Sequence, residues 1–305
     1  MLLEGMIIAS NLKFRGNRTT SACYNILIGK KSVQTLQDIH VYGLGPLYGV
    51  YKALARHRFQ SVVQHLLDER LLTLLDSKTV MPTKKGATWL KDQKFDLHHF
   101  NGIHYHAVEP VFIRRLLLLI QTMTNAANNY FSFIPIEDDR LILNWVKKIY
   151  RQNNHPEKVL ERLYYELFSL LSNIHEEQAE MFVDRITGYL HYGASIRQLS
   201  QAYNLSVDDV HLKLTLVNHR MIQMISDSDA YPFMQKVLTG IEQPSTMSHS
   251  ASQTYDMIKK KYTPEEISVA RGLKLNTVYD HIVEIIYFDP NIPSNRLSPV
   301  GRKTE

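Results

Sequence analysis

The sequence predicts a mostly α-helical protein with a small β-hairpin in its N-terminal third. Apolar residues recur every three or four positions through 111–124, 141–150, 159–171 and 182–190, which is the period of a helix with one buried face. Strand-like segments are confined to 71–75 and 79–81, on either side of an Asp-Ser-Lys turn. The 305 residues, 44% of them apolar, are enough for two or three domains.

Several protein classes are excluded by composition. The longest apolar run, 116–120, is much shorter than the about 20 residues of a membrane-spanning helix, so we expect no membrane partner. The N-terminus lacks the pattern of a secretory signal, and the single cysteine, Cys23, excludes a disulfide framework or a multi-cysteine zinc site. We therefore expect a cytoplasmic protein, associated with the nucleoid if it binds DNA.

The first hundred residues predict a winged helix. Helical segments are expected at 20–27, 34–39, 46–54 and 59–69, followed by the hairpin and by a Thr-x-x-Gly start that leads into a helix at 87–90. Basic residues in this region can hold the DNA backbone without reading sequence. They are Lys30, Lys31, Arg56, Arg58, Lys78, Lys84 and Lys85.

Residues 253–288 predict a helix-turn-helix. Thr263 and Pro264 are typical of a helix start, and Gly272 can take the left-handed conformation that ends a helix. Lys274 or Asn276 can cap the second helix, which is the helix that enters the DNA major groove in this motif. Its exposed start holds candidate base contacts, flanked by two candidate phosphate contacts. The candidates are Asn276, Thr277, Tyr279 and His281, with Arg271 and Lys274 as the flanking pair.

Residues 101–240 predict a helical domain, interrupted at 125–139, that contains an earlier copy of the same motif at 195–216. A shift of 68 positions aligns this first copy with the second, and Asn204 stands where the second copy has Gly272. Asp208 and Asp209 occupy the positions of Asn276 and Thr277, so carboxylates would face phosphate. We therefore expect the first copy to be structural or to bind protein. A flexible linker at 241–252 and a disordered tail at 289–305 complete the predicted organisation.

Charge is distributed unevenly along the chain. Residues 1–100 carry 14 Lys and Arg against 7 Asp and Glu, residues 101–244 carry 13 against 16, and residues 245–305 carry 8 against 7. Basic ends around an acidic middle suit a protein that contacts nucleic acid at its ends and another molecule in between.

Two parts of the sequence resemble modules of one helicase family. Residues 252–284 resemble the helix-turn-helix at the C-termini of RecQ-type helicases and LuxR-type regulators, through the spacing of Gly272-Leu273, Thr277-Val278 and His281-Ile282. Residues 20–90, particularly IGKKSVQTLQDI, resemble the RQC winged helix of the same helicases. Together the chain resembles the YpbB-like family of low-GC Gram-positive bacteria. This resemblance implies an accessory subunit that supplies DNA-binding domains to RecS, a short RecQ-family helicase.

The sequence departs from a complete helicase in two respects. It has no Gly-x-x-x-x-Gly-Lys-Ser/Thr phosphate loop, and one cysteine cannot make the four-cysteine zinc module of RecQ helicases. Neither a catalytic arrangement nor a cofactor motif is recognisable, and His98, His99, His104 and His106 lack convincing ligand spacing, so we expect no enzyme activity, cofactor or metal. A sequence-specific transcriptional regulator and a protein-only adaptor are the alternative hypotheses.

Overall fold

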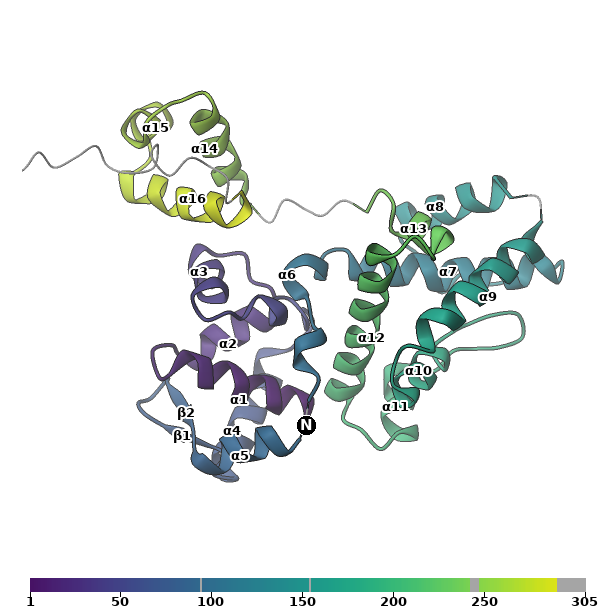
Figure 1. Ribbon diagram of the computed structural model, residues 1–305, viewed down its shortest axis with the longest axis horizontal. Coiled ribbons are helices and arrows are strands. Elements are labelled where there is room, and N and C mark those ends of the chain that lie inside the picture. Colours follow the sequence, from purple (N-terminus) through teal and green to yellow (C-terminus); the bar gives the residue numbers. More distant parts are fainter. Residues whose placement is uncertain (94, 154, 242–246, 290–305) are drawn as a thin grey trace, which may run out of the picture. The chain divides into compact units, whose positions relative to one another are not determined.

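The structure is a computed structural model that describes residues 1–93, 95–153, 155–241 and 247–289 (Figure 1). Over these ranges it is mostly α-helical with a two-stranded antiparallel sheet, as predicted. The chain divides into two compact units. Unit 1 holds Met1–Gly29 and Gly45–Glu242, and unit 2 holds Lys30–Leu44 together with the described residues after 246.

The first half of unit 1 is built around a buried N-terminal helix. Its elements are α1 (Leu2–Phe14), α2 (Thr20–Leu27), the short 3-10 helix η1 (Gly45–Leu47), α4 (Arg56–Asp68), β1 (Leu72–Leu74), β2 (Val80–Pro82) and α5 (Lys84–Asp92). Helix α1 contacts α2, α4, α5 and β2. In the hairpin Leu72 pairs with Pro82, and the Asp76 carboxylate accepts hydrogen bonds from two backbone N–H groups of the turn. The hairpin between α4 and α5 lies where the sequence predicts it, but the helix expected at 34–39 as part of the winged helix falls in unit 2.

Two expectations for this half are wrong. Residues 46–54 form only the single 3-10 turn η1 and then a series of turns, because Gly49 has a φ of +69° that a continuous right-handed helix excludes. A Cβ at Gly49 would also lie 2.8 Å from the His106 side chain. Conversely, α1 was not expected. Its buried residues lie on every side of the helix, so it has no apolar stripe for a periodicity argument to find.

The second half of unit 1 is an all-helical assembly around α7. Its elements are η2 (Leu97–His99), α6 (Gly102–Tyr105), α7 (Glu109–Ala127), α8 (Arg140–Arg151), α9 (Pro156–Leu171), α10 (Glu176–Val183), α11 (Ile196–Ala202), α12 (Val207–Asp227) and α13 (Pro232–Leu238). Helix α7 contacts α8, α9, α12 and α13 and contributes much of the shared apolar core. Three of the four predicted helical stretches are confirmed. The fourth, 182–190, is wrong after Val183, where the chain turns and Gly188 bridges to His191.

Unit 2 contains α3 (Val33–Val41), α14 (His249–Lys259), α15 (Pro264–Arg271) and α16 (Leu275–Phe288). Helix α16 contacts α3, α14 and α15. The predicted linker is wrong at its C-terminal end, because α14 already begins at His249 after a Ser248 cap. Residues 242–246 of that linker and 290–305 of the predicted disordered tail lie outside the described residues. Within the described chain, no helix combines the length and the apolar character needed to cross a membrane.

Candidate nucleic-acid interface

Helices α15 and α16 form the predicted helix-turn-helix. Thr263 and Glu266 make a reciprocal capping box at the start of α15, and Pro264 occupies its first turn. Gly272 ends α15 with a left-handed φ of +61°, as predicted. Lys274 takes the N-cap position of α16 without a capping bond from its side chain. The local sequence therefore sets both ends of the turn.

An apolar core fixes α16 against α14 and α15. Fully or nearly fully buried residues from the three helices meet there: Ala251, Ile258, Ile267, Val278, Ile282 and Ile285. The three members on α16 repeat at four and three positions, so a single face of that helix is buried. The opposite polar positions near the start of α16 remain available to solvent.

The exposed start of α16 carries residues suited to DNA. Lys274 and Asn276 are exposed, and Thr277 is half-buried beside them. A helix N-terminus favours the negative charge of phosphate, and an asparagine side chain can donate to and accept from a base edge. Tyr279 is also half-buried, and its hydroxyl lies 3.4 Å from the Glu265 carboxylate. The pKa of Tyr279 is raised by desolvation and by that carboxylate.

Arg271 lies in a different environment from the phosphate contact that the sequence predicted. Its guanidinium donates to the Ser250 carbonyl at 2.8 Å, the Ser250 hydroxyl at 3.0 Å and the Gln253 side-chain oxygen at 2.8 Å. It also donates to the Thr254 hydroxyl, which is fully buried. Arg271 therefore ties the end of α15 to α14.

His281 is buried, so the expectation that it lies on the exposed start of α16 is wrong. Its Nδ1 lies 3.0 Å from the Thr254 hydroxyl, on the face of α16 that packs against α14. Burial lowers the pKa of His281, and the positive charge of Arg271 lowers it further. The period of the helix explains the error, because position 281 follows Val278 by three residues and shares its inward face.

The basic residues predicted to contact DNA in the N-terminal third differ in exposure and in whether they bond to other residues. Lys30 and Lys31 are exposed in unit 2, immediately before α3, and Lys78 and Lys84 are exposed on the hairpin turn and the first turn of α5. The Lys85 ammonium donates to the Glu69 carbonyl at 2.7 Å and pairs with the Glu69 carboxylate at 3.8 Å. Arg56 lies 4.6 Å over the Tyr24 ring and donates to the Ser21 hydroxyl.

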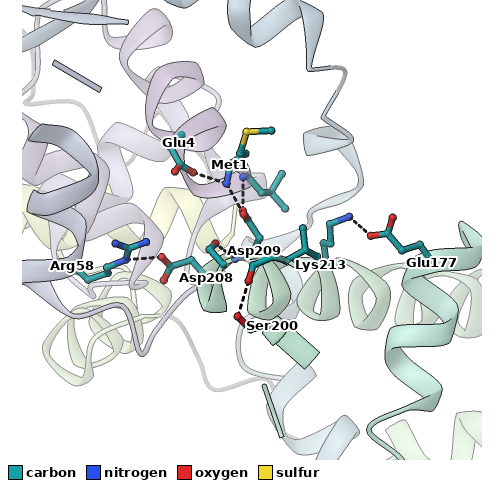
Figure 2. A network of polar contacts seen from close by, with 11 residues as sticks. Met1, Glu4, Arg58, Glu177, Ser200, Asp208, Asp209 and Lys213 are labelled. Atoms are coloured by element: carbon teal, nitrogen blue, oxygen red, sulfur yellow. Dashed lines mark hydrogen bonds and ion pairs between the residues drawn. The ribbon is translucent and has the colours of Figure 1, made fainter. Parts of the chain in front are cut away.

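Arg58 is engaged by the first helix-turn-helix copy (Figure 2). Its Nε donates to Asp208 at 2.7 Å, and the Tyr51 hydroxyl donates to the other oxygen of the same carboxylate at 2.7 Å. The adjacent Asp209 accepts from the backbone nitrogens of Met1 and Leu2. Both carboxylates are buried. In the first copy, the start of the second helix, α12, which would face DNA in a DNA-binding motif, instead bonds to the N-terminal half of unit 1. This agrees with the expectation that the first copy is structural or binds protein.

The two copies share a turn geometry, and the left-handed turn expected at Asn204 from its alignment with Gly272 is confirmed. Asn204 has a left-handed φ of +50°, matching Gly272, and Ser195 with Gln198 forms a capping box like that of Thr263 with Glu266. In addition, the Ser200 hydroxyl donates to the Leu205 carbonyl at 2.6 Å, and the Ser268 hydroxyl donates to the Leu273 carbonyl at 2.7 Å. The signal was present in the sequence, because Ser200 and Ser268 are also 68 positions apart.

Three potential metal ligands lie together in unit 1. Asp96, His98 and His99 place one ligand atom each within 4.8 Å of one another, on and beside η2. Asp96 and His98 are exposed and His99 is half-buried, and exposed groups of this kind are common without an ion. His106 does not belong to this group of ligands. It is buried, and its Nδ1 bonds to the Gly102 carbonyl at 2.9 Å. The expectation of no metal site remains a prediction.

Comparison with known proteins supports DNA binding by the helix-turn-helix region. Residues 250–304 match the family model of a helix-turn-helix domain. The chain is also 25% identical over 289 residues to Protein YpbB of Bacillus subtilis (strain 168), covering 93% of this chain and 82% of that protein. No solved structure matches significantly. The chain is thus similar to YpbB over most of its length and matches a helix-turn-helix domain at its C-terminal end. Helices α14–α16 are the part that supports DNA binding.

Proposed function

We propose that this protein is a non-enzymatic DNA-binding subunit that assists a RecQ-family, RecS-like helicase in DNA repair or recombination. The observation that carries the proposal is the start of α16, where Lys274 and Asn276 are exposed on a rigid three-helix unit. Residues of these types at the start of the second helix are suited to phosphate and base contact. The protein would act in the cytoplasm, at the nucleoid.

Backbone contacts supply most of the affinity in this proposal. Lys274 would neutralise a phosphate at the start of α16, and Lys78 and Lys84 would add contacts from the winged-helix part of unit 1. Arg56, Arg58 and Arg271 are excluded from this set, because each is engaged by other side chains. Binding of this kind is indifferent to sequence and suits a protein that holds duplex near a fork.

The helicase part of the proposal rests on resemblance. The RQC-like order of helices and hairpin at the N-terminus and the helix-turn-helix at the C-terminus are found together in RecQ-type helicases, whereas this sequence has no phosphate loop. A chain with DNA-contacting modules and no motor would need a motor from another chain. The similarity to YpbB agrees with this reading, but the name of that protein assigns no partner.

The helicase part is tested by mixing the purified full chain with the RecQ-family helicase of the same organism. We expect the two to co-elute in size-exclusion chromatography at micromolar concentration and the chain to accelerate unwinding of a forked duplex. The Lys274→Ala variant should retain co-elution but lose part of the acceleration. Separate elution together with unchanged unwinding would contradict the helicase role, even if the chain binds DNA. Selection of a single enriched DNA sequence would instead favour a transcriptional regulator.

A further inference from the structure

Helix α9 exposes an aromatic surface that no described part of the chain covers. The side chains of Tyr164, Tyr165 and Phe168 are 62%, 63% and 60% exposed. Tyr164 and Phe168 stack at a ring-centroid distance of 5.9 Å, and Tyr164 meets Tyr165 at 5.6 Å. Grouped exposed aromatic residues are uncommon on a monomer surface and are typical of protein interaction sites.

This surface continues into a groove between α9 and α10. Phe168 lines an open groove of about 790 Å³, and Tyr203, which follows α11, also lines it. The apolar part of its lining consists of Phe168, Leu171, Ile174, Ala179 and Val183. The volume lies within the range of about 300–1,000 Å³ that is typical of ligand-binding pockets. The groove is therefore suited to apolar side chains presented by another molecule.

The rim of the groove is acidic. Glu176, Glu180 and Asp184 line it, and no cation does so among the described lining residues. Glu176 and Glu180 are exposed, while Asp184 accepts a hydrogen bond from the Tyr203 hydroxyl at 2.8 Å. The pKa of Tyr203 is raised to about 12, by burial first and then by Asp184, Glu180 and Glu177. The tyrosine thus lies in the negative field of this rim.

We propose that the groove between α9 and α10 binds a basic amphipathic helix of a partner protein. Two or three aliphatic side chains at helical spacing would enter the apolar lining beside Phe168, and lysine or arginine side chains would face Glu176 and Glu180. The charge of the rim argues against DNA as the occupant, because phosphates would meet three carboxylates. The aromatic residues of α9 would form the centre of the interface.

This inference deepens the proposed function, since an accessory subunit needs a surface for its partner, and it rests on that function only for the partner's identity. Its failure is distinguishable from failure of the proposed function. The groove is tested with peptides alone, whereas the proposed function is tested with DNA and helicase. If the chain binds no such peptide but still associates with the helicase, the proposal for the groove is wrong and the proposed function is unaffected.

The test is a selection of displayed random peptides of about 16 residues, long enough for four helical turns. The full chain is the target, and the Phe168→Ser variant serves for counter-selection. We expect enriched peptides with apolar residues three and four positions apart and with several Lys or Arg. Enrichment of acidic peptides, or equal enrichment on the Phe168→Ser variant, would overturn the proposal.

The best enriched peptide is then measured by fluorescence anisotropy against further variants of the full chain. Tyr164→Ser and the double variant Glu176→Gln/Glu180→Gln should each weaken binding by about tenfold, and the double variant should also reduce its salt dependence. All three residues are exposed, so the fold should persist. Leu141→Ser is the matched control, because Leu141 is an exposed apolar residue on α8 that does not line the groove. An equal loss in the control would overturn the proposal.

Two further measurements identify other occupants. Sedimentation that shows a dimer in the wild type and a monomer in the Phe168→Ser variant would assign the groove to a second copy and overturn the proposal. Peptide binding that appears only when residues 290–305 are deleted would assign the groove to the chain's own basic tail, which also overturns it. A monomer whose peptide affinity is unchanged by the deletion supports the proposed partner.

Discussion

Arg271 and Lys274 are three residues apart on one turn, yet their surroundings differ completely. Arg271 donates to Ser250, Gln253 and Thr254 of α14, whereas Lys274 is exposed at the start of α16. Both were predicted as phosphate contacts, because each is a basic residue beside the turn and the local sequence does not distinguish an exposed side chain from one bonded to α14. The partner of Arg271 depends on how α14 packs, which is a long-range property that residue spacing does not contain.

Replacing Arg271 by alanine should loosen the three-helix unit. The change leaves the buried Thr254 hydroxyl without its guanidinium donor, and a lost buried partner costs about 1–3 kcal/mol. Hydrogen exchange followed by mass spectrometry should report reduced protection of the α14 and α16 amides by that amount. Lys274→Ala is the control and should change protection by less than about 0.5 kcal/mol. Equal protection in the Arg271→Ala variant would show that the contacts to α14 add nothing to stability.

His219 should make the stability of unit 1 dependent on pH. Its ring is buried and its Nδ1 accepts from the Asn101 N–H at 3.0 Å. Burial, with a smaller effect of His106, lowers its pKa from 6.5 to about 3. As the pH falls below about 6.5, His219 therefore becomes protonated in the unfolded chain but stays neutral in the folded protein. The free energy of unfolding should fall by about 2 kcal/mol between pH 6.5 and pH 5 from this group alone.

Urea unfolding at several pH values measures this dependence through Trp89 and Trp145, which both lie in unit 1. The His219→Asn variant keeps an acceptor for Asn101 and should have a shallower slope between pH 6.5 and pH 5. His104→Asn is the control, because His104 is exposed. An unchanged slope in the His219→Asn variant would contradict the assignment of the pH dependence to this residue.

At the scale of elements, the ends of helices were better predicted than the buried helices. The Thr263 cap and the Gly272 stop follow from local chemistry, so their positions could be read from a few residues. Helix α1 escaped prediction because it is buried on all sides, and the predicted helix at 182–190 ends at Val183, before the bridge between Gly188 and His191. Local signals therefore located the candidate site more accurately than the core.

The two copies of the helix-turn-helix use one scaffold for different contacts. Capping boxes and left-handed turns are common to both, but the start of α12 has Asp208 and Asp209 where α16 has Asn276 and Thr277. Burial of Asp208 against Arg58 and Tyr51 explains why an acid is suitable there. The charge of Asp208 and Asp209 was enough to predict that the first copy does not bind DNA. It did not predict that Asp208 bonds to Arg58 and Tyr51.

Replacing Asp208 by asparagine should destabilise unit 1 by about 1–3 kcal/mol, because the carboxylate is buried and accepts from both Arg58 and Tyr51. Arg58→Ala should cost less than about 1 kcal/mol, because the Arg58 side chain is 47% exposed and solvent screens the pair. Urea unfolding followed by tryptophan fluorescence compares the two variants. A larger loss in Arg58→Ala than in Asp208→Asn would contradict the account of this contact.

For the whole molecule, the helical class and the hairpin were predictable, but the division into units was not. The sequence divides at 100 and 240 by composition and motif, whereas contacts join the N-terminal half and the following helices in unit 1. They also place Lys30–Leu44 with the helix-turn-helix in unit 2. Such associations depend on contacts between residues more than a hundred positions apart, as between Arg58 and Asp208, and no local pattern encodes them.

The central claim is that the start of α16 binds DNA, and fluorescence anisotropy of the full chain with a labelled duplex tests it most directly. The Lys274→Ala/Asn276→Ala variant should weaken binding by about tenfold or more and reduce the slope of log affinity against log salt by about 1. Lys236→Ala is the matched control, because Lys236 is an exposed lysine on α13 of unit 1, and it should bind like the wild type. Undiminished binding and an unchanged salt slope in the double variant would contradict the claim.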